Sequence, residues 1–171
     1  MDRSNAVIRR LSGADAVRWQ WFRIAALEDT PEAFQQTLKE ARAAPLDDWV
    51  RDLSGPSLIF GAFVADQLVG TVMFSLSASP KMTHRGQLGG VYVIPEFRRY
   101  GIGRLLVDAA LAYAVQHVEQ VHLCVVTDNV AAYDVYRRAG FQAYGIEPRG
   151  HKYNGRYYDG TMMVKFLRAG R

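Results

Sequence analysis

The stretch LGGVYVIPEFRRYGIGRLLVD, residues 88–108, decides the fold. It begins as a β-strand over 91–94, and Pro95 ends this strand because proline has no N–H to donate to a neighbouring strand. A helix begins at the glycine turn 101–103, and its apolar face is expected to consist of Leu105, Leu106, Ala109, Ala110 and Tyr113. A strand that enters a helix through such a turn leaves free backbone N–H groups at the positive end of the helix dipole. The turn therefore suits a phosphate or pyrophosphate group.

Two common phosphate-binding patterns do not fit this turn. A Walker A loop requires Gly-Lys-Ser/Thr, whereas Gly103 is followed by Arg104. A dinucleotide fingerprint requires a third glycine where Leu106 stands. The remaining pattern is Arg-x-x-Gly-x-Gly over 98–103, unless the glycines serve only to permit a structural turn.

A second motif follows one strand later, over 129–141, and reads NVAAYDVYRRAGF. The pair of motifs resembles the GNAT N-acetyltransferase superfamily. The first is similar to its acyl-coenzyme A signature, Arg/Gln-x-x-Gly-x-Gly/Ala. The second is similar to Asn-x-x-Ala-x-x-x-Tyr-x-x-x-Gly-Phe, with the matching residues Asn129, Ala132, Tyr136, Gly140 and Phe141. The resemblance is close over 86–146 and extends to the earlier elements only in their order.

The resemblance implies acetyl-coenzyme A as co-substrate and no metal. The backbone of the central strand would bind the pantetheine arm, with Gly89 and Gly90 permitting close approach or a bulge. The basic turn would bind the pyrophosphate, and the strand would splay from its parallel neighbour to admit the acetyl group. The implied coenzyme-binding residues are Val91, Tyr92, Val93, Arg98, Arg99, Tyr100, Gly101, Ile102, Gly103, Arg104, Asn129 and Tyr136.

Two of these residues also have simpler interpretations. Asn129 is a favoured helix N-cap residue, and this role is compatible with holding pantetheine. Tyr136 lies on an amphipathic helix, where a single tyrosine commonly serves packing. The resemblance makes Tyr136 the general acid, since a phenol is protonated near neutral pH and can donate to a departing thiolate.

The general base is not assigned by the motifs. Some family members carry an acidic residue in the central strand, where this chain has Gln87. The remaining candidates are Glu28, His84, Glu147 and Asp159, or a chain of water molecules. Each of them is equally compatible with an ordinary surface position.

Neither a disulfide nor a Cys/His metal site is expected. Cys124 is the only cysteine, so no internal disulfide forms, and it is predicted to lie in a buried strand over 121–126. Direct transfer is therefore expected rather than an acyl-cysteine intermediate. His117, His122 and His151 show no metal-ligand spacing.

The composition fits one soluble domain over 1–171. The net charge is +4, which suits a polyanionic coenzyme or a nucleic acid equally well, but no Lys/Arg-rich run supports nucleic-acid binding. No signal peptide and no apolar run near the ~18 residues of a membrane span is visible. A cytoplasmic protein that does not bind a membrane is the expectation.

The remaining patterns predict an α/β fold of the GNAT type. A strand over 6–11 precedes a helix to about residue 27, whose Ser-x-x-Asp start lies at 12–15 and whose apolar face contains Val17, Trp21 and Ile24. Further helices are expected over 31–43, 46–53 and 129–139, and strands over 58–65, 67–76, 121–126, 141–146 and 162–167. We expect a mixed sheet, antiparallel first and parallel in the centre, with helices on both faces. The connection 28–36 is a candidate wall of a pocket.

The Asn154-Gly155 turn predicts a hairpin, with Tyr153, Tyr157 and Tyr158 around it. These aromatic side chains either line an acceptor pocket or form ordinary cross-strand pairs. The function expected from all these features is transfer of an acetyl group to a primary amine of a small molecule or peptide, by direct attack in a ternary complex. The alternatives are transfer of another acyl group and a non-catalytic acyl-coenzyme A sensor. A homodimer is possible, but no feature of the sequence establishes it.

Overall fold

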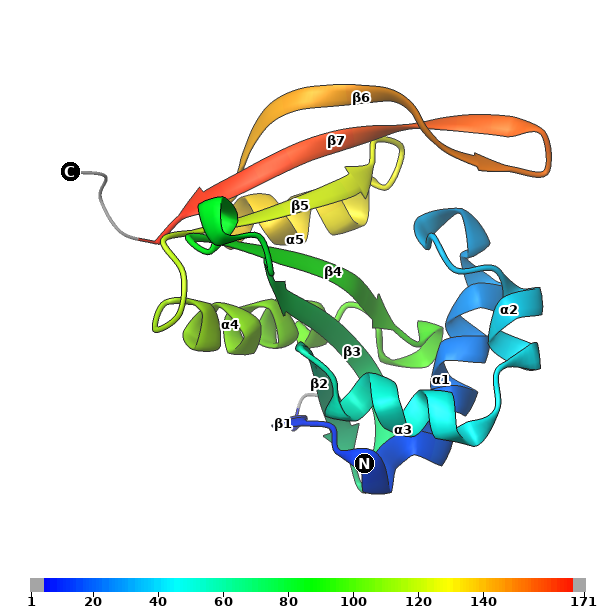
Figure 1. The fold of residues 1–171 in the computed structure, drawn as a ribbon. Coiled ribbons are helices and arrows are strands. Elements are labelled where there is room, and N and C mark those ends of the chain that lie inside the picture. Colours follow the sequence, from blue (N-terminus) through cyan, green and yellow to red (C-terminus); the bar gives the residue numbers. More distant parts are fainter. Residues whose placement is uncertain (1–4, 168–171) are drawn as a thin grey trace.

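A computed structural model describes residues 5–167 and places seven strands in one mixed sheet of order β1-β2-β3-β4-β5-β7-β6 (Figure 1). All neighbouring strands are antiparallel except β4 and β5, which are parallel. The strands are β1 (Val7–Arg10), β2 (Ser57–Val64), β3 (Gln67–Leu76), β4 (Arg85–Val93), β5 (Gln120–Val126), β6 (Gln142–Tyr153) and β7 (Arg156–Phe166). The expected mixed sheet is confirmed.

Two apolar cores lie against the sheet and confirm that helices cover both faces. One core joins α4 and α5 to the sheet through buried residues such as Leu106, Tyr136 and Phe74. The other joins α1 and α3 to the sheet through Trp19 and Trp49. The helices are α1 (Ala16–Asp29), α2 (Leu38–Ala43), α3 (Leu46–Ser54), α4 (Ile102–Ala114) and α5 (Val130–Arg138), with short 3-10 turns η1 (Gly13–Asp15), η2 (Pro31–Ala33), η3 (Pro80–Met82) and η4 (Pro95–Phe97). None of the described helices is long and apolar enough to cross a membrane.

The parallel pair β4–β5 is hydrogen-bonded only at its start. Arg85, Gly86 and Gln87 pair with the first three residues of β5, and no pairing joins the two strands beyond that point. Figure 1 shows the strands diverging toward their C-terminal ends, with α1 and α2 on the open side. The splay that the family resemblance implies is therefore present.

The buried face of α1 differs from the predicted one. Val17 and Trp21 are 52% and 69% exposed, whereas Trp19, Phe22 and Ala26 are buried. Both sets have the spacing of one helical face, so periodicity alone does not choose between them. In α4, likewise, Leu105 is exposed, and the residues that fill the core are Ile102, Leu106, Val107, Ala110, Leu111 and Ala114.

The segment expected to be one helix over 31–43 is divided. After η2, Phe34 is extended, and α2 begins only after Thr37. Thr37 and Glu40 form a capping box, in which the Glu40 N–H donates to the Thr37 hydroxyl over 3.2 Å. This Thr-x-x-Glu start signal is visible in the sequence but was not included in the prediction. The break brings Phe34 and Gln36 against α1.

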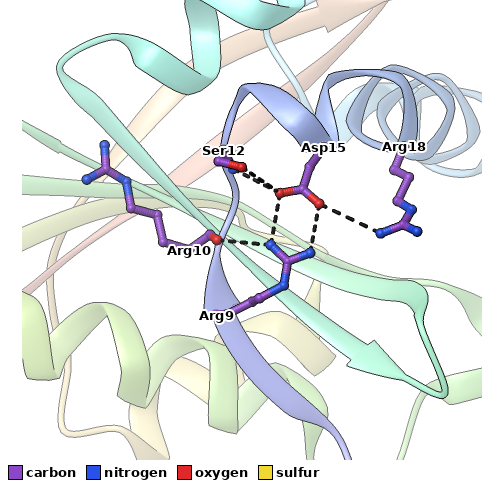
Figure 2. A network of polar contacts seen from close by, with 5 residues as sticks. All are labelled: Arg9, Arg10, Ser12, Asp15 and Arg18. Atoms are coloured by element: carbon purple, nitrogen blue, oxygen red, sulfur yellow. Dashed lines mark hydrogen bonds and ion pairs between the residues drawn. The ribbon is translucent and has the colours of Figure 1, made fainter.

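The junction between β1 and α1 is held by a polar network (Figure 2). The Arg9 guanidinium donates to both carboxylate oxygens of Asp15, over 2.7 and 2.8 Å, and the Ser12 N–H donates to the same carboxylate over 2.9 Å. Arg18 lies 3.8 Å from it. The Arg9 guanidinium and the Ser12 hydrogen bonds together lower the pKa of Asp15 to about 2. The predicted Ser-x-x-Asp helix start is confirmed.

Candidate active site

The strand β4 carries a bulge where the sheet opens. Gly89 pairs with Met73 and Tyr92 pairs with Thr71, so two residues of β4 lie opposite the single residue Val72. Gly90 has a φ of +59°, which glycine adopts without strain. Of the two roles expected of Gly89 and Gly90, close approach or a bulge, the structure shows a bulge, formed by Gly90 and Val91. Beyond it, the edge of β4 that faces β5 makes no strand pairing and can bind an extended chain.

The side chain of Tyr92 points away from this edge, toward α1. Its ring makes edge contacts with Phe22 and Phe34, at centroid distances of 5.6 and 6.2 Å. Its hydroxyl donates to Asp29 over 3.1 Å. Burial and the neighbouring Asp29 raise the pKa of Tyr92 to about 12. Of the predicted coenzyme-binding positions 91–93, this one can offer only its backbone.

The start of α4 has the geometry of an anion site. Gly101 is the N-cap residue, with a φ of +79° and no side-chain cap. The first intrahelical bond runs from the Leu105 N–H to the Gly101 carbonyl, so the N–H groups of the first turn have no acceptor within the helix. A Cβ at Gly101 would contact nothing within 4 Å. Ile102 is 1% exposed and anchors the turn in the core.

The three arginines predicted beside this turn have different surroundings. Arg98 donates to the Val93 carbonyl over 2.9 Å and forms an ion pair with Asp29. The Arg104 guanidinium donates to Asp108 over 2.8 Å and, through another nitrogen, to the Arg138 carbonyl over 2.8 Å. Arg99 has a φ of +69° and makes no side-chain hydrogen bond or ion pair within residues 5–167. Arg99 is therefore the arginine whose charge is available to a ligand without the loss of an internal contact.

The helix α5 presents Asn129 and Tyr136. The Asn129 side chain accepts from the Ala132 N–H over 3.1 Å, which confirms the N-cap role and leaves its NH₂ group to donate elsewhere. Tyr136 is 6% exposed and packs edge-on against Phe141, with ring centroids 6.0 Å apart. Burial raises the pKa of Tyr136 well above its usual value, so the phenol keeps its proton. Its hydroxyl makes no hydrogen bond with any other described residue.

These features agree with a known family. Residues 19–141 match the acetyltransferase (GNAT) family. The chain belongs to the GNAT family. Mycothiol acetyltransferases are among its relatives. The protein of Thermobispora bispora is 31% identical over 139 residues, which cover 79% of this chain and 45% of the relative. That of Geodermatophilus obscurus is 29% identical over 140 residues, which cover 80% and 44%. The chain thus spans less than half the length of these relatives.

Solved structures show the same fold. The structure of yncA from Salmonella typhimurium, determined with its cofactor acetyl-CoA, superposes with a TM-score of 0.83 at 20% identity and covers 98% of this chain and 96% of yncA. At this level of identity the likeness concerns the GNAT fold alone. The GNAT fold predicted from the two motifs is therefore confirmed.

The four candidate bases of this GNAT chain lie in three places. Glu28 is exposed at the end of α1 and forms an ion pair with Arg42. His84 precedes β4, at the closed end of the β4–β5 pair, where its carbonyl accepts from the Gln120 N–H. Glu147 and Asp159 lie on β6 and β7 beside the C-terminal end of β5: Glu147 pairs with Gly160, and Gly160 pairs with Val126. The Asp159 carboxylate accepts from the Arg149 N–H over 2.8 Å.

Cys124 is only partly buried, whereas the sequence predicts a core position for it. Its sulfur lies beside Gly160, where a Cβ would come within 2.4 Å of it, and therefore on the same face as Glu147. Burial and the charge of Glu147 raise the pKa of the Cys124 thiol. A thiol held in its protonated form is a poor nucleophile.

Two residues of this region were not found by sequence reasoning. Asp29 joins Tyr92 and Arg98, which lie 63 and 69 positions further along the chain. Arg23 reaches the bulge of β4 from α1. Neither residue belongs to a motif, and both contacts depend on the packing of α1 against the sheet. No local pattern could have indicated them.

Proposed function

We propose that this GNAT chain transfers an acetyl group from acetyl-coenzyme A to a primary amine by direct attack in a ternary complex. The observation that carries the proposal is the junction of β4 with β5 and α4. Strand pairing stops after Gln87, a glycine bulge follows, and the same strand leads to an uncapped helix N-terminus. An extended amide chain that ends in a pyrophosphate needs these two sites in this order.

Acetyl-coenzyme A fits the residues at this junction. The unpaired edge of β4 over 91–93 would hold the pantetheine amides, and the NH₂ group of Asn129 would donate to the same arm. The first-turn N–H groups of α4 and the Arg99 guanidinium would bind the pyrophosphate. When bound, acetyl-coenzyme A supplies the acetyl thioester. Backbone N–H groups of β4 next to the bulge would stabilise the oxyanion, an effect worth about 3–4 kcal/mol per donor in other acyl-transfer sites.

The proton steps belong to two groups of this chain. Tyr136 would protonate the departing thiolate, since its raised pKa keeps the proton on the phenol until then. Glu147 or Asp159, directly or through water, would accept the proton of the amine. Their position beside the open end of β5 favours them over His84, which lies at the closed end.

The experiment combines binding with turnover. Calorimetry with acetyl-coenzyme A tests the coenzyme site, and a thiol-release assay over amino acids, polyamines, aminoglycosides and peptide N-termini tests the transfer. Binding together with release that depends on an amine supports the proposal. Binding without release across the panel would favour an acyl-coenzyme A sensor, and absence of binding would overturn both. Propionyl-coenzyme A in the same assay tests the acyl group.

A further inference from the structure

Arg23 lies in the middle of α1 and extends toward the bulge of β4. Its Nη1 atom is 3.9 Å from the position that a Cβ would occupy on Gly90. Its guanidinium carbon lies 4.3 Å from the centre of the Phe34 ring, and Nε donates to the Gln36 side chain over 3.1 Å. The guanidinium is thereby held in a fixed orientation at the point where the acetyl group is proposed to lie.

This guanidinium has no ion-pair partner within residues 5–167. Most other arginines of the described chain pair with a carboxylate, as Arg98 does with Asp29. The charge that acts most on Arg23 is that of Asp52 on α3, which forms no ion pair with it within 4 Å. Burial lowers the pKa of Arg23 to about 10, so the side chain remains cationic at neutral pH. A partly buried cation without a partner is costly, and binding of an anion would offset that cost.

The donors left on Arg23 match a carboxylate. A guanidinium has five N–H groups, of which the structure engages the one on Nε. The N–H groups on the two terminal nitrogens have no protein acceptor among the described residues. Their planar fork fits the two oxygens of a carboxylate.

We propose that Arg23 binds the carboxylate of the acceptor, and that the acceptor is a free α-amino acid. In an α-amino acid the amine and the carboxylate are attached to the same carbon, so a carboxylate held by Arg23 keeps the amine next to Gly90. The N-terminus of a peptide carries no such carboxylate. This inference rests on the proposed acetyl transfer and narrows its acceptor.

The test compares each α-amino acid with its own amide, which keeps the amine and loses the anion. For the best amino acid, we expect kcat/KM to exceed that of the amide by about 10- to 100-fold in the wild-type protein, as for a charge-assisted bidentate pair. Arg23→Gln should remove this preference by raising KM for the acid while leaving the amide unchanged. Arg23→Lys should restore part of it, since charge remains and the fork is lost.

Controls separate this inference from a structural role and from the proposed function. Arg10→Gln removes another arginine side chain, one that points away from the β1–α1 network (Figure 2), and should leave the preference unchanged. Calorimetric binding of acetyl-coenzyme A should be the same in every variant, and unfolding midpoints show whether each variant is folded.

Three results would overturn the role of Arg23 and leave acetyl transfer standing: equal use of acid and amide by the wild-type protein, an equal loss for both in Arg23→Gln, or a fall in kcat for every amine. Failure of the wild-type protein to bind acetyl-coenzyme A would instead overturn the proposed function. If no amine turns over, calorimetric titration of the coenzyme complex with the amino acid and its amide tests Arg23 directly. Equal binding of the two would refute the inference.

Discussion

Within residues 5–167, two strands lead into a helix by way of a 3-10 turn, and the polar groups at these two junctions have opposite surroundings. Between β1 and α1, Asp15 accepts hydrogen bonds from Arg9 and from Ser12 (Figure 2), and its side chain is 5% exposed. Between β4 and α4, the N-cap residue is Gly101, which has no side chain to accept from the first-turn N–H groups. The chain itself satisfies the polar groups of the first junction, whereas the first-turn N–H groups of the second have no acceptor within the helix and are available to an anion.

This difference in hydrogen bonding suits the first junction to stability and the second to ligand binding. A capped junction uses its hydrogen bonds for stability, because each buried polar group has a partner. An uncapped junction leaves donors exposed and available for binding. Variants of the first should therefore change unfolding, and variants of the second should change binding or turnover.

The largest effect is expected at Tyr136 on helix α5. Tyr136→Phe removes the proposed proton donor while keeping the packing against Phe141. We expect kcat to fall by about 10²- to 10⁴-fold, which corresponds to about 3–5 kcal/mol in the barrier. Stopped-flow or steady-state thiol release measures this change.

Tyr133→Phe on the same helix is the control, since Tyr133 also packs against the core. It should turn over like the wild-type protein. Both variants should bind acetyl-coenzyme A with unchanged affinity. Unchanged kcat in Tyr136→Phe would reduce Tyr136 to a packing residue.

A smaller effect, on stability, is expected when the junction between β1 and α1 loses its carboxylate. Asp15→Ala removes the acceptor of the Arg9 and Ser12 hydrogen bonds and leaves Arg9 unpaired. The lowered pKa of Asp15 indicates about 2 kcal/mol of stabilisation, reduced by solvent screening because Arg9 is 43% exposed. Urea unfolding should give a loss of about 1–2 kcal/mol. A loss of acetyl-coenzyme A affinity without a loss of stability would contradict the division between the two junctions.

The sequence predicts the junction between β4 and α4 better than it predicts the contacts of α1 with β4. The strand, the glycine turn, the Asn129 cap and the Asn154-Gly155 hairpin follow from local chemistry, and each is present. The prediction of which face of α1 is buried was wrong, because two sets of residues both have the spacing of one helical face. The contacts of Arg23 and Asp29 with β4 depend on that face, so no local rule could supply them.

The next comparison concerns two glycines that have nearly the same positive φ. Gly101 and Gly155 have φ values of +79° and +80°, and a Cβ on either one would contact nothing within 4 Å. Alanine at each position should cost about 1 kcal/mol of stability, because L-residues are strained at positive φ. Only Gly101→Ala places a methyl group at the proposed pyrophosphate site, so only this variant should weaken acetyl-coenzyme A binding. Equal coenzyme affinity in the two variants would place the pyrophosphate elsewhere.

The smallest effect is the loss of stability at low pH, which should come from the junction between β1 and α1 through Asp15. The pKa of Asp15 is about 2 in the folded chain and about 4 when unfolded, so its contribution is complete above the unfolded value and is lost as the pH falls through the folded value. Between pH 5 and pH 3 we expect a loss of about 1 kcal/mol from this residue. Urea unfolding of wild-type and Asp15→Asn proteins at both pH values measures it, because the asparagine variant should lack that part of the slope. If the free energy of unfolding changes equally with pH in both proteins, ionised Asp15 gives no net stability. The hydrogen bonds and ion pairs of Figure 2 would then not stabilise the junction between β1 and α1.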